Sequence, residues 1–383
     1  MLKKIKPLLC IIIVFVAVLL TVPFRSVTTY IKSALNSNKN YILEVNTVSP
    51  NIKSVTCDPN NKLLVLVSVR DFMGKPIPRI KVDNKVENGV GEISPQYGVT
   101  DEDGNCLITY TPPELSNKNI DKFKNNIPLN AIISSSIPKA NTKKSLEIGI
   151  KRIPIVYIHG YQESKNVFNS MDNYLTKMGF ESGFFSYDSN EGVETSAELF
   201  AKFLEESRTY YLDKGLKVQS FDVICHSMGG LVARYYTCSD NYWKASDVNK
   251  LIFIATPHKG SHIASIGASI YDDLGIRDLQ PDSQVIKEEF PKMFNKGLNS
   301  TIQTANILGE YDEVVTFDSS SLDEWDIKTE IYNVGDSNLS VDGILKGTFM
   351  SALNHKNILS NTKIFNRIED MLYKDLKYPT YLQ

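Results

Sequence analysis

The chain has few cysteines and little net charge. Its 383 residues include only five cysteines, too few for a disulfide scaffold, and their spacing matches no metal site. Charge is nearly balanced, because 42 Lys and Arg face 44 Asp and Glu for a net charge of -2. That balance gives no argument for a nucleic-acid partner. We therefore expect no metal, no organic cofactor and no nucleic acid; the sequence is silent on oligomeric state.

Long hydrophobic runs are also scarce, and the one at the N-terminus is short. Residues 8–22 are uncharged and apolar, and they follow Lys3, Lys4 and Lys6. The run falls short of the roughly 20 residues that span a bilayer comfortably. No small-x-small cleavage site follows it. We expect residues 1–25 to form a signal anchor, or else a cleaved signal peptide, and residues 26–40 a polar stalk. Either way, the globular part would lie outside the cytoplasm, tethered to the membrane or secreted.

Residues 41–150 show short apolar alternations broken by Pro, Gly, Asn and Asp, for example at residues 62–69 and 106–110. Strands at intervals of roughly 8–12 residues predict an all-β sandwich. The segments 71–76 (D-F-M-G-K-P) and 100–104 (T-D-E-D-G) resemble the turns of bacterial Ig-like domains of the invasin type. That resemblance implies a spacer domain.

Two features of this region have a second interpretation. The acidic residues 101–103 suggest calcium, but Asp-Gly is a hairpin-turn signal, and we expect a hairpin turn. Cys57 and Cys106 lie on expected strands and could form a disulfide in an oxidising compartment.

The pattern changes near residue 150, where we place the domain boundary. Strand-like runs at residues 153–158, 183–187, 218–224 and 251–255 alternate with helical spacing at 166–178, 195–211 and 229–237. Such a rhythm predicts the α/β class, with a parallel sheet covered on both faces. Functional groups are then expected at the carboxyl ends of the strands.

Residues 221–230 (F-D-V-I-C-H-S-M-G-G) carry the strongest chemical signal. A serine between a buried strand and a helix is typical of a nucleophile elbow, in which the turn exposes the hydroxyl. Cys225 replaces the first glycine of the G-x-S-x-G pattern, but cysteine is still compact. We expect Ser227 to be a nucleophile; an ordinary helix-capping serine is the alternative.

A serine nucleophile needs a base, and the chain has only five histidines. His159, His226 and His258 occupy tight turns at strand ends, and His262 begins an expected cap segment. His355 lies close to the C-terminus, before a last amphipathic helix, where the loop after the final strand would deliver a base. We therefore expect His355 to be the general base.

The carboxylate that orients this base has more than one candidate. Asp312 follows an expected strand at residues 305–309, and residues 329–334 then remain to form the last strand before His355. Asp342 also satisfies the order Ser, Asp, His, but it leaves no apolar run for that strand. Asp336 ranks third. We favour Asp312, and the choice between it and Asp342 stays open.

An oxyanion needs two donors aimed at the developing charge. We expect them to be the backbone N–H groups of Met228, directly after the nucleophile, and of Tyr161, in the loop after the first strand. His159 is expected to hold that loop by hydrogen bonding.

Three motifs together resemble the α/β-hydrolase lipases: H-G-Y at residues 159–161, C-H-S-M-G-G-L-V-A-R at 225–234 and A-T-P-H-K-G-S at 255–261. The chain is similar there to bacterial triacylglycerol lipases and to GPI inositol-deacylase-like hydrolases. The resemblance covers roughly residues 153–375, and it implies that Asp312, in G-E-Y-D-E-V-V at 309–315, is the acid. It also implies an ester or lipid substrate.

Residues 261–300 form an insertion whose apolar residues have helical spacing. They indicate either a lid over an acyl-binding cleft or packing against the core.

We predict an α/β-hydrolase with a mostly parallel sheet at residues 151–383, preceded by an Ig-like sandwich. Its expected activity is that of a serine carboxylic-ester hydrolase. An acyltransferase with the same triad and an inert surface scaffold remain as alternatives.

Overall fold

The computed structural model describes residues 41–115, 117–269, 271–335 and 353–382. The expected signal anchor (1–25), the stalk (26–40) and the carboxylates Asp336 and Asp342 lie outside these residues. Among the described residues, no helix is both long enough and apolar enough to cross a membrane.

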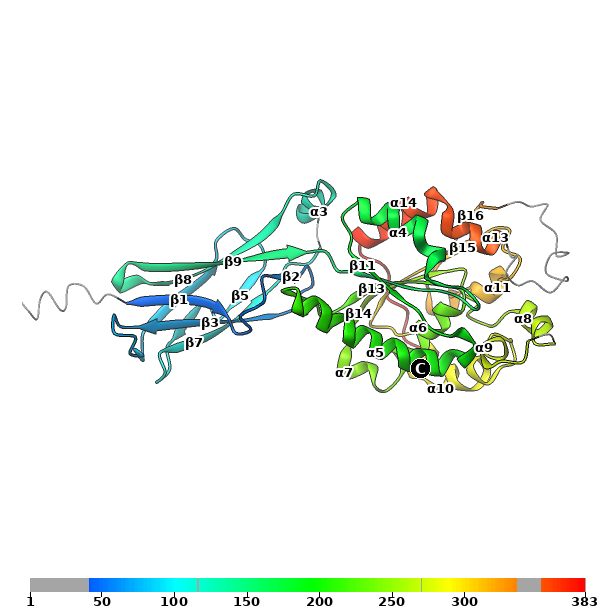
Figure 1. The fold of residues 1–383 in the computed structure, drawn as a ribbon, viewed down its shortest axis with the longest axis horizontal. Coiled ribbons are helices and arrows are strands. Elements are labelled where there is room, and N and C mark those ends of the chain that lie inside the picture. Colours follow the sequence, from blue (N-terminus) through cyan, green and yellow to red (C-terminus); the bar gives the residue numbers. More distant parts are fainter. Residues whose placement is uncertain (1–40, 116, 270, 336–352, 383) are drawn as a thin grey trace, which may run out of the picture.

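The first described part, residues 42–151, is built mainly from strands (Figure 1). They are β1 (Ile42–Thr47), β2 (Ser54–Thr56), β3 (Leu63–Arg70), β4 (Lys81–Val86), β5 (Glu92–Ser94), β6 (Tyr97–Val99), β7 (Asn105–Thr111), β8 (Leu129–Ile137) and β9 (Thr142–Lys151). The helix α3 (Asn117–Lys124) and the 3₁₀ turn η1 (Pro138–Ala140) complete it. One sheet has the order β1-β3-β7-β5, and the other contains β2-β9-β8-β4-β6. Side chains alternate between buried and exposed along β1 and β7, because successive residues of a strand point to opposite faces.

The turn at residues 101–104 is tight, but it does not join a hairpin. Gly104 donates its N–H to the Asp101 carbonyl and has φ +67°, a conformation that favours glycine. The flanking strands β6 and β7 belong to different sheets, so the expectation of a hairpin there is wrong. Asp101 accepts the N–H of Asn105, and the described residues contain no group of side chains suited to a metal ion.

The disulfide that the sequence left open is not formed. Cys57 and Cys106 are both buried free thiols. Cys106 belongs to β7, whereas Cys57 follows β2 of the other sheet and lies 3.1 Å from the Pro113 carbonyl oxygen.

The second part is a six-stranded sheet with helices on both faces (Figure 1). The order is β11-β10-β13-β14-β15-β16, and every pairing is parallel. Its strands are β10 (Ile155–Ile158), β11 (Ser182–Phe185), β13 (Phe221–His226), β14 (Val248–Ile254), β15 (Gln303–Gly309) and β16 (Thr329–Tyr332). Its helices are α4 (Asn169–Lys177), α5 (Gly192–Asp213), α6 (Met228–Cys238), α7 (Tyr242–Ala245), α11 (Phe317–Ser320), α13 (Leu353–Asn357) and α14 (Thr362–Tyr373). Short turns of helix are η2 (Lys165–Phe168), η3 (Ser189–Glu191), η6 (Asp323–Trp325) and η8 (Ile358–Ser360).

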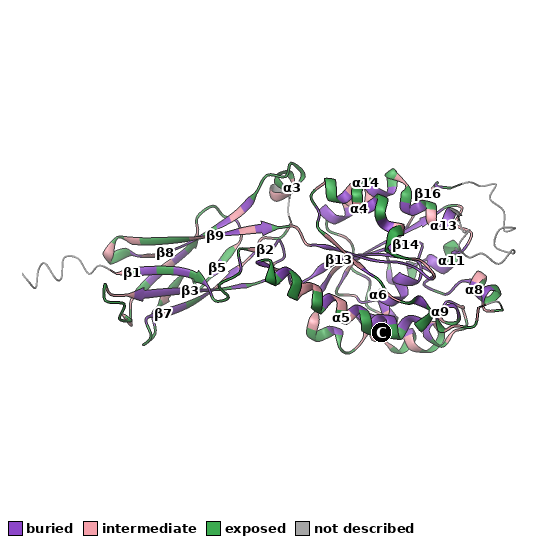
Figure 2. Ribbon diagram, in the orientation of Figure 1, coloured by how far each residue is buried: buried purple, intermediate pink, exposed green. Residues whose placement is uncertain are grey.

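The apolar strands of this sheet are buried on both faces, as Figure 2 shows for β13 and β14. Ile155 and Tyr157 of β10 join a cluster with residues of α4 and α14. Val156 and Ile158 of the same strand join a second cluster with α5 and α6. The strands and helices expected between residues 153 and 255 are confirmed, and residues 329–332 form the last described strand.

The insertion at residues 261–300 contains α8 (His262–Gly267), α9 (Leu274–Asp278), the π-helical turn η4 (Val285–Glu289), α10 (Phe290–Lys292) and η5 (Phe294–Gly297). Its buried residues, among them Ala264, Ile276 and Leu279, pack on Met228 and Leu231 of α6. The insertion is therefore a cap over the carboxyl ends of the strands, and we call it the cap.

Candidate active site

Ser227 occupies a sharp turn between β13 and α6. Its φ and ψ are 52° and -125°, in a region that a non-glycine residue enters only at a cost. The strand and the helix pass very close here: a Cβ on Gly229 would lie 2.5 Å from the Ile158 carbonyl oxygen. One on Gly230 would lie 2.1 Å from Thr256 Oγ1. The turn thus has the form of a nucleophile elbow, and buried Cys225 fits beneath it.

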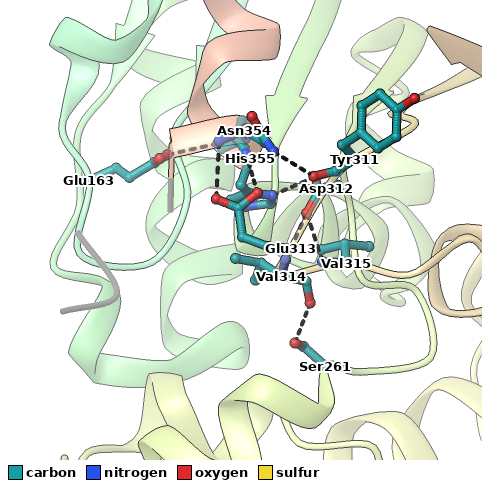
Figure 3. Close-up of polar contacts among 10 residues, drawn as sticks. Glu163, Ser261, Tyr311, Asp312, Glu313, Val314, Val315, Asn354 and His355 are labelled. Atoms are coloured by element: carbon teal, nitrogen blue, oxygen red, sulfur yellow. Dashed lines mark hydrogen bonds and ion pairs between the residues drawn. The ribbon is translucent and has the colours of Figure 1, made fainter. Parts of the chain in front are cut away.

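The structure brings His355 and Asp312 together. His355 Nδ1 lies 2.8 Å from Asp312 Oδ2, and the two side chains are only 6% and 1% exposed (Figure 3). Asp312 follows β15, and its other oxygen accepts the N–H groups of Val314 and Val315 at 2.9 and 2.8 Å. The carboxylate is therefore fixed in place and directed at the imidazole.

Ser227 and His355 line one small cavity of about 30 Å³. Its other lining residues are Tyr161, Glu163, Pro257, Ser261, Ala264, Leu279, Val314 and Lys356. Ser261, Ala264 and Leu279 belong to the cap, which therefore both covers this cavity and packs against α6. A cavity of this size holds about one or two water molecules but no acyl chain.

Burial lowers the pKa of His355, but its interactions with Asp312 and with the carboxylates of Glu163 and Glu313 outweigh burial. The net effect is a pKa raised above the ordinary histidine value. This is the shift expected of an imidazole whose protonated form is stabilised by a carboxylate.

Of the two expected oxyanion donors, Tyr161 lines the cavity and Met228 directly follows Ser227 in the chain. Met228 is the first residue of α6, and the first N–H groups of a helix have no partner within it. Tyr161 lines the cavity directly, and its hydroxyl donates to Asp273 Oδ2 of the cap at 2.6 Å. The preceding N–H, that of Gly160, is used otherwise, since it donates to Glu163 Oε2 at 2.8 Å.

The other histidines lie in different surroundings. His159 Nδ1 is 2.9 Å from the Gly160 carbonyl oxygen, and its ring stacks on Tyr187, so it holds its own loop as expected. Burial lowers the pKa of His258 far below its ordinary value, beside the Arg234 guanidinium. His262 is exposed on α8.

Sequence reasoning missed two carboxylates that hold this site. Glu313 accepts the N–H groups of Asn354 and His355 at 3.0 and 3.2 Å (Figure 3). Glu163 binds His226 and the Gly160 N–H. Glu313 could have been identified from the sequence, because it directly follows Asp312. Glu163 lies three residues after Gly160, and no general rule assigns a site residue to that position.

The parallel sheet, the sharp turn at Ser227 after β13 and the position of Asp312 after β15 are those of the α/β-hydrolase fold. A family profile described as a PGAP1-like alpha/beta domain matches residues 150–275. Over 130 residues the chain is 32% identical to GPI inositol-deacylase B of Yarrowia lipolytica, which covers 28% of this chain. The chain spans 14% of the length of that relative.

Solved structures with a similar arrangement include a lipase and a phospholipase. The mature form of the Bacillus licheniformis lipase BlEst2 is 17% identical, with a TM-score of 0.43 over 57% of this chain and 91% of the lipase. Phospholipase PlaB of Legionella pneumophila is 15% identical, with a TM-score of 0.38 over 57% of this chain and 64% of the phospholipase.

Proposed function

We propose that this protein is a serine hydrolase of carboxylic esters, with Ser227, His355 and Asp312 as its catalytic triad. The observation that carries the proposal is a strained serine at a strand-to-helix turn, in one cavity with a buried imidazole that a carboxylate orients. The names of the relatives, a deacylase, a lipase and a phospholipase, agree with this reaction class.

The reaction would follow the usual two steps. Ser227 Oγ attacks the ester carbonyl while His355 Nε2 takes the hydroxyl proton, and Asp312 stabilises the imidazolium. The tetrahedral intermediate collapses to an acyl-enzyme, and His355 gives the proton to the departing alcohol. Water then attacks the acyl-enzyme and passes a proton to His355, and His355 returns that proton to Ser227 Oγ as the bond to the acyl group breaks and the acid is released. The N–H groups of Tyr161 and Met228 would stabilise each oxyanion, each by about 3–4 kcal/mol.

An acyl group does not fit in about 30 Å³, so we propose that the cap is a lid whose movement opens an acyl-binding cleft. A panel of p-nitrophenyl esters of increasing acyl length measures how far that cleft extends. A rate that peaks at medium or long acyl chains supports a lipid ester as the substrate. Activity on the acetate ester alone contradicts an acyl-binding cleft.

A fluorophosphonate reagent tests the activity itself. It should label the wild-type protein covalently, and Ser227→Ala should remain unlabelled while keeping the wild-type melting temperature. Ser261→Ala is a suitable control, because Ser261 lines the same cavity and donates to the Val314 carbonyl. Equal labelling of wild type and Ser227→Ala would reject the proposal, and labelling of neither would favour an inert scaffold.

We further propose that residues 41–150 are an Ig-like spacer and that residues 1–25 tether the chain, with the hydrolase outside the cytoplasm. The basic-then-apolar pattern at residues 3–22 supports the tether. In intact cells, external protease should remove the ester hydrolase activity. Protection of that activity until the cells are lysed would contradict the proposal.

A further inference from the structure

A second carboxylate–imidazole pair lies beside the first. Glu163 Oε2 is 2.8 Å from His226 Nδ1, and the side chains are 3% and 0% exposed. His226 precedes the candidate nucleophile, and Glu163 follows the loop of Tyr161. The mechanism proposed above uses neither side chain, although burial of a charged group is costly unless the group is paired.

The hydrogen-bond partners of His226 determine its protonation. Nδ1 faces a carboxylate oxygen, and Nε2 lies 3.0 Å from the main-chain carbonyl oxygen of His355. Carbonyl and ionised carboxylate oxygens only accept hydrogen bonds. With Glu163 ionised, hydrogen bonds at both positions need a proton on each ring nitrogen, so this geometry favours an imidazolium opposite the carboxylate.

Electrostatics favours the ionised form of Glu163. Burial alone would raise the pKa of Glu163, but attraction and hydrogen bonding to His226, attraction to His355 and the Gly160 N–H together lower it to about 2. A lone carboxylate in the cavity of Ser227 would oppose the negative charge that develops on the substrate oxygen. The His226 imidazolium compensates the negative charge of the Glu163 carboxylate.

The pair also joins separate parts of the site. Glu163 Oε2 accepts the Gly160 N–H at 2.8 Å, directly before the expected donor Tyr161. His226 reaches the main chain of His355 in α13, whose N–H is held on its other side by Glu313. The oxyanion loop, the elbow and the base are thus linked through two side chains.

We propose that Glu163 and His226 form a positioning pair, which fixes the loop of Gly160 and Tyr161 relative to the main chain of His355 and leaves no unpaired Glu163 carboxylate beside Ser227. This inference rests on the proposed ester hydrolysis. The pair touches no reacting atom, so its loss should lower kcat and leave KM for a small ester nearly unchanged.

The kinetic test uses the full chain with p-nitrophenyl acetate. Glu163→Gln, which keeps an acceptor for Gly160 but loses the charge, should lower kcat about tenfold, and His226→Gln about a hundredfold, the scale expected when catalytic groups are misplaced. The double variant should recover part of the activity that His226→Gln loses, because the unpaired carboxylate is gone. Glu205→Gln, on the exposed part of α5, serves as the matched control.

Two results would overturn the proposal. One is a raised KM with unchanged kcat in both single variants, and the other is a double variant less active than His226→Gln. Melting temperatures identify any variant that fails to fold, and in that case the spectroscopic test below decides.

That test reads the charge of His226 in the wild type without any turnover. In a sample labelled with ¹⁵N at histidine, the signals of His226 are identified as those that are missing from His226→Gln. If that variant does not fold, they are identified as the signals that shift in Glu163→Gln. Two N–H protons on this ring at neutral pH are expected; a ring with a single proton overturns the pair. Absence of fluorophosphonate labelling of Ser227 would instead reject the proposed function and leave this measurement unaffected.

Discussion

His355 is held at three points by different chemical groups. Asp312 binds Nδ1, Glu313 accepts the main-chain N–H, and His226 lies against the main-chain carbonyl oxygen. The bond to Asp312 fixes the tautomer, because a proton on Nδ1 leaves Nε2 free to accept one. Because the main chain of His355 is held through both its N–H and its carbonyl oxygen, the imidazole ring has little freedom to move away from Asp312.

Asp312→Asn should therefore lower kcat/KM by about 10⁴-fold, because an amide stabilises neither this tautomer nor the imidazolium. The pH profile should change too. Burial lowers the pKa of His355, but Asp312, together with Glu163 and Glu313, raises it above the ordinary histidine value. Without Asp312 the pKa falls, the base loses its proton at lower pH, and the acid limb of kcat/KM moves to lower pH.

The measurement is kcat/KM for a p-nitrophenyl ester across pH, with Asp342→Asn as the comparison. Asp342→Asn should retain the wild-type rate and profile. A large loss in Asp342→Asn and little in Asp312→Asn would reassign the acid.

At the scale of elements, the elbow depends on how closely β13, β10 and α6 approach. The helix contacts the sheet through Gly229 and Gly230, where any side chain would collide with Ile158 or Thr256. This close approach lets Ser227 take its positive φ while its own N–H bonds to the Ile254 carbonyl oxygen at 3.0 Å.

Gly230→Ala should destabilise the protein by about 1–3 kcal/mol, the usual cost of overpacking, because its Cβ would lie 2.1 Å from Thr256 Oγ1. Urea unfolding followed by circular dichroism measures the change. Gly183→Ala on β11 is the control, since its Cβ would meet only Phe203, at an ordinary 3.5 Å. Equal midpoints for the two variants would show that α6 can move away without cost.

The sequence was sufficient to predict the elements that follow simple periodic or motif rules. The β–α alternation, the elbow of Ser227 and the position of Asp312 after β15 all follow from local patterns. The contacts of Glu163 and His226 do not, because they join three segments whose proximity is created by the sheet order. The turn at residues 101–104 was misjudged for a related reason: a tight turn does not reveal whether its strands share a sheet.

At the scale of the whole molecule, the strand-rich first part and the α/β part lie end to end (Figure 1). Main-chain and side-chain hydrogen bonds join them. The strand β12 (Leu216–Lys217), which follows α5, pairs in parallel with β2 and extends its sheet. Ser220 donates to Asp58 at 2.7 Å across the same junction. One hydrophobic cluster includes residues of both sheets of the first part and of β10. These contacts predict that the two parts unfold together.

Asn61→Ala tests this coupling. Asn61 is fully buried; it donates to the Lys217 carbonyl oxygen and accepts from Lys217 Nζ, both at 2.7 Å. Its removal should leave the half-buried polar groups of Lys217 without this partner, at a total cost of about 1–3 kcal/mol. The exposed neighbour Asn60 provides the control, and Asn60→Ala should change little.

Tryptophan fluorescence reports the outcome, because the chain has two tryptophans, Trp243 and Trp325, and both lie in the α/β part. If the parts unfold as one unit, Asn61→Ala should lower the urea midpoint of the fluorescence transition as much as that of the far-ultraviolet circular dichroism. A circular dichroism transition that shifts or splits while the fluorescence midpoint stays at the wild-type value would mean that the α/β part keeps its stability without the contacts of Asn61. The junction would then be a contact between independently stable parts, since a cooperative unit must lose both signals together.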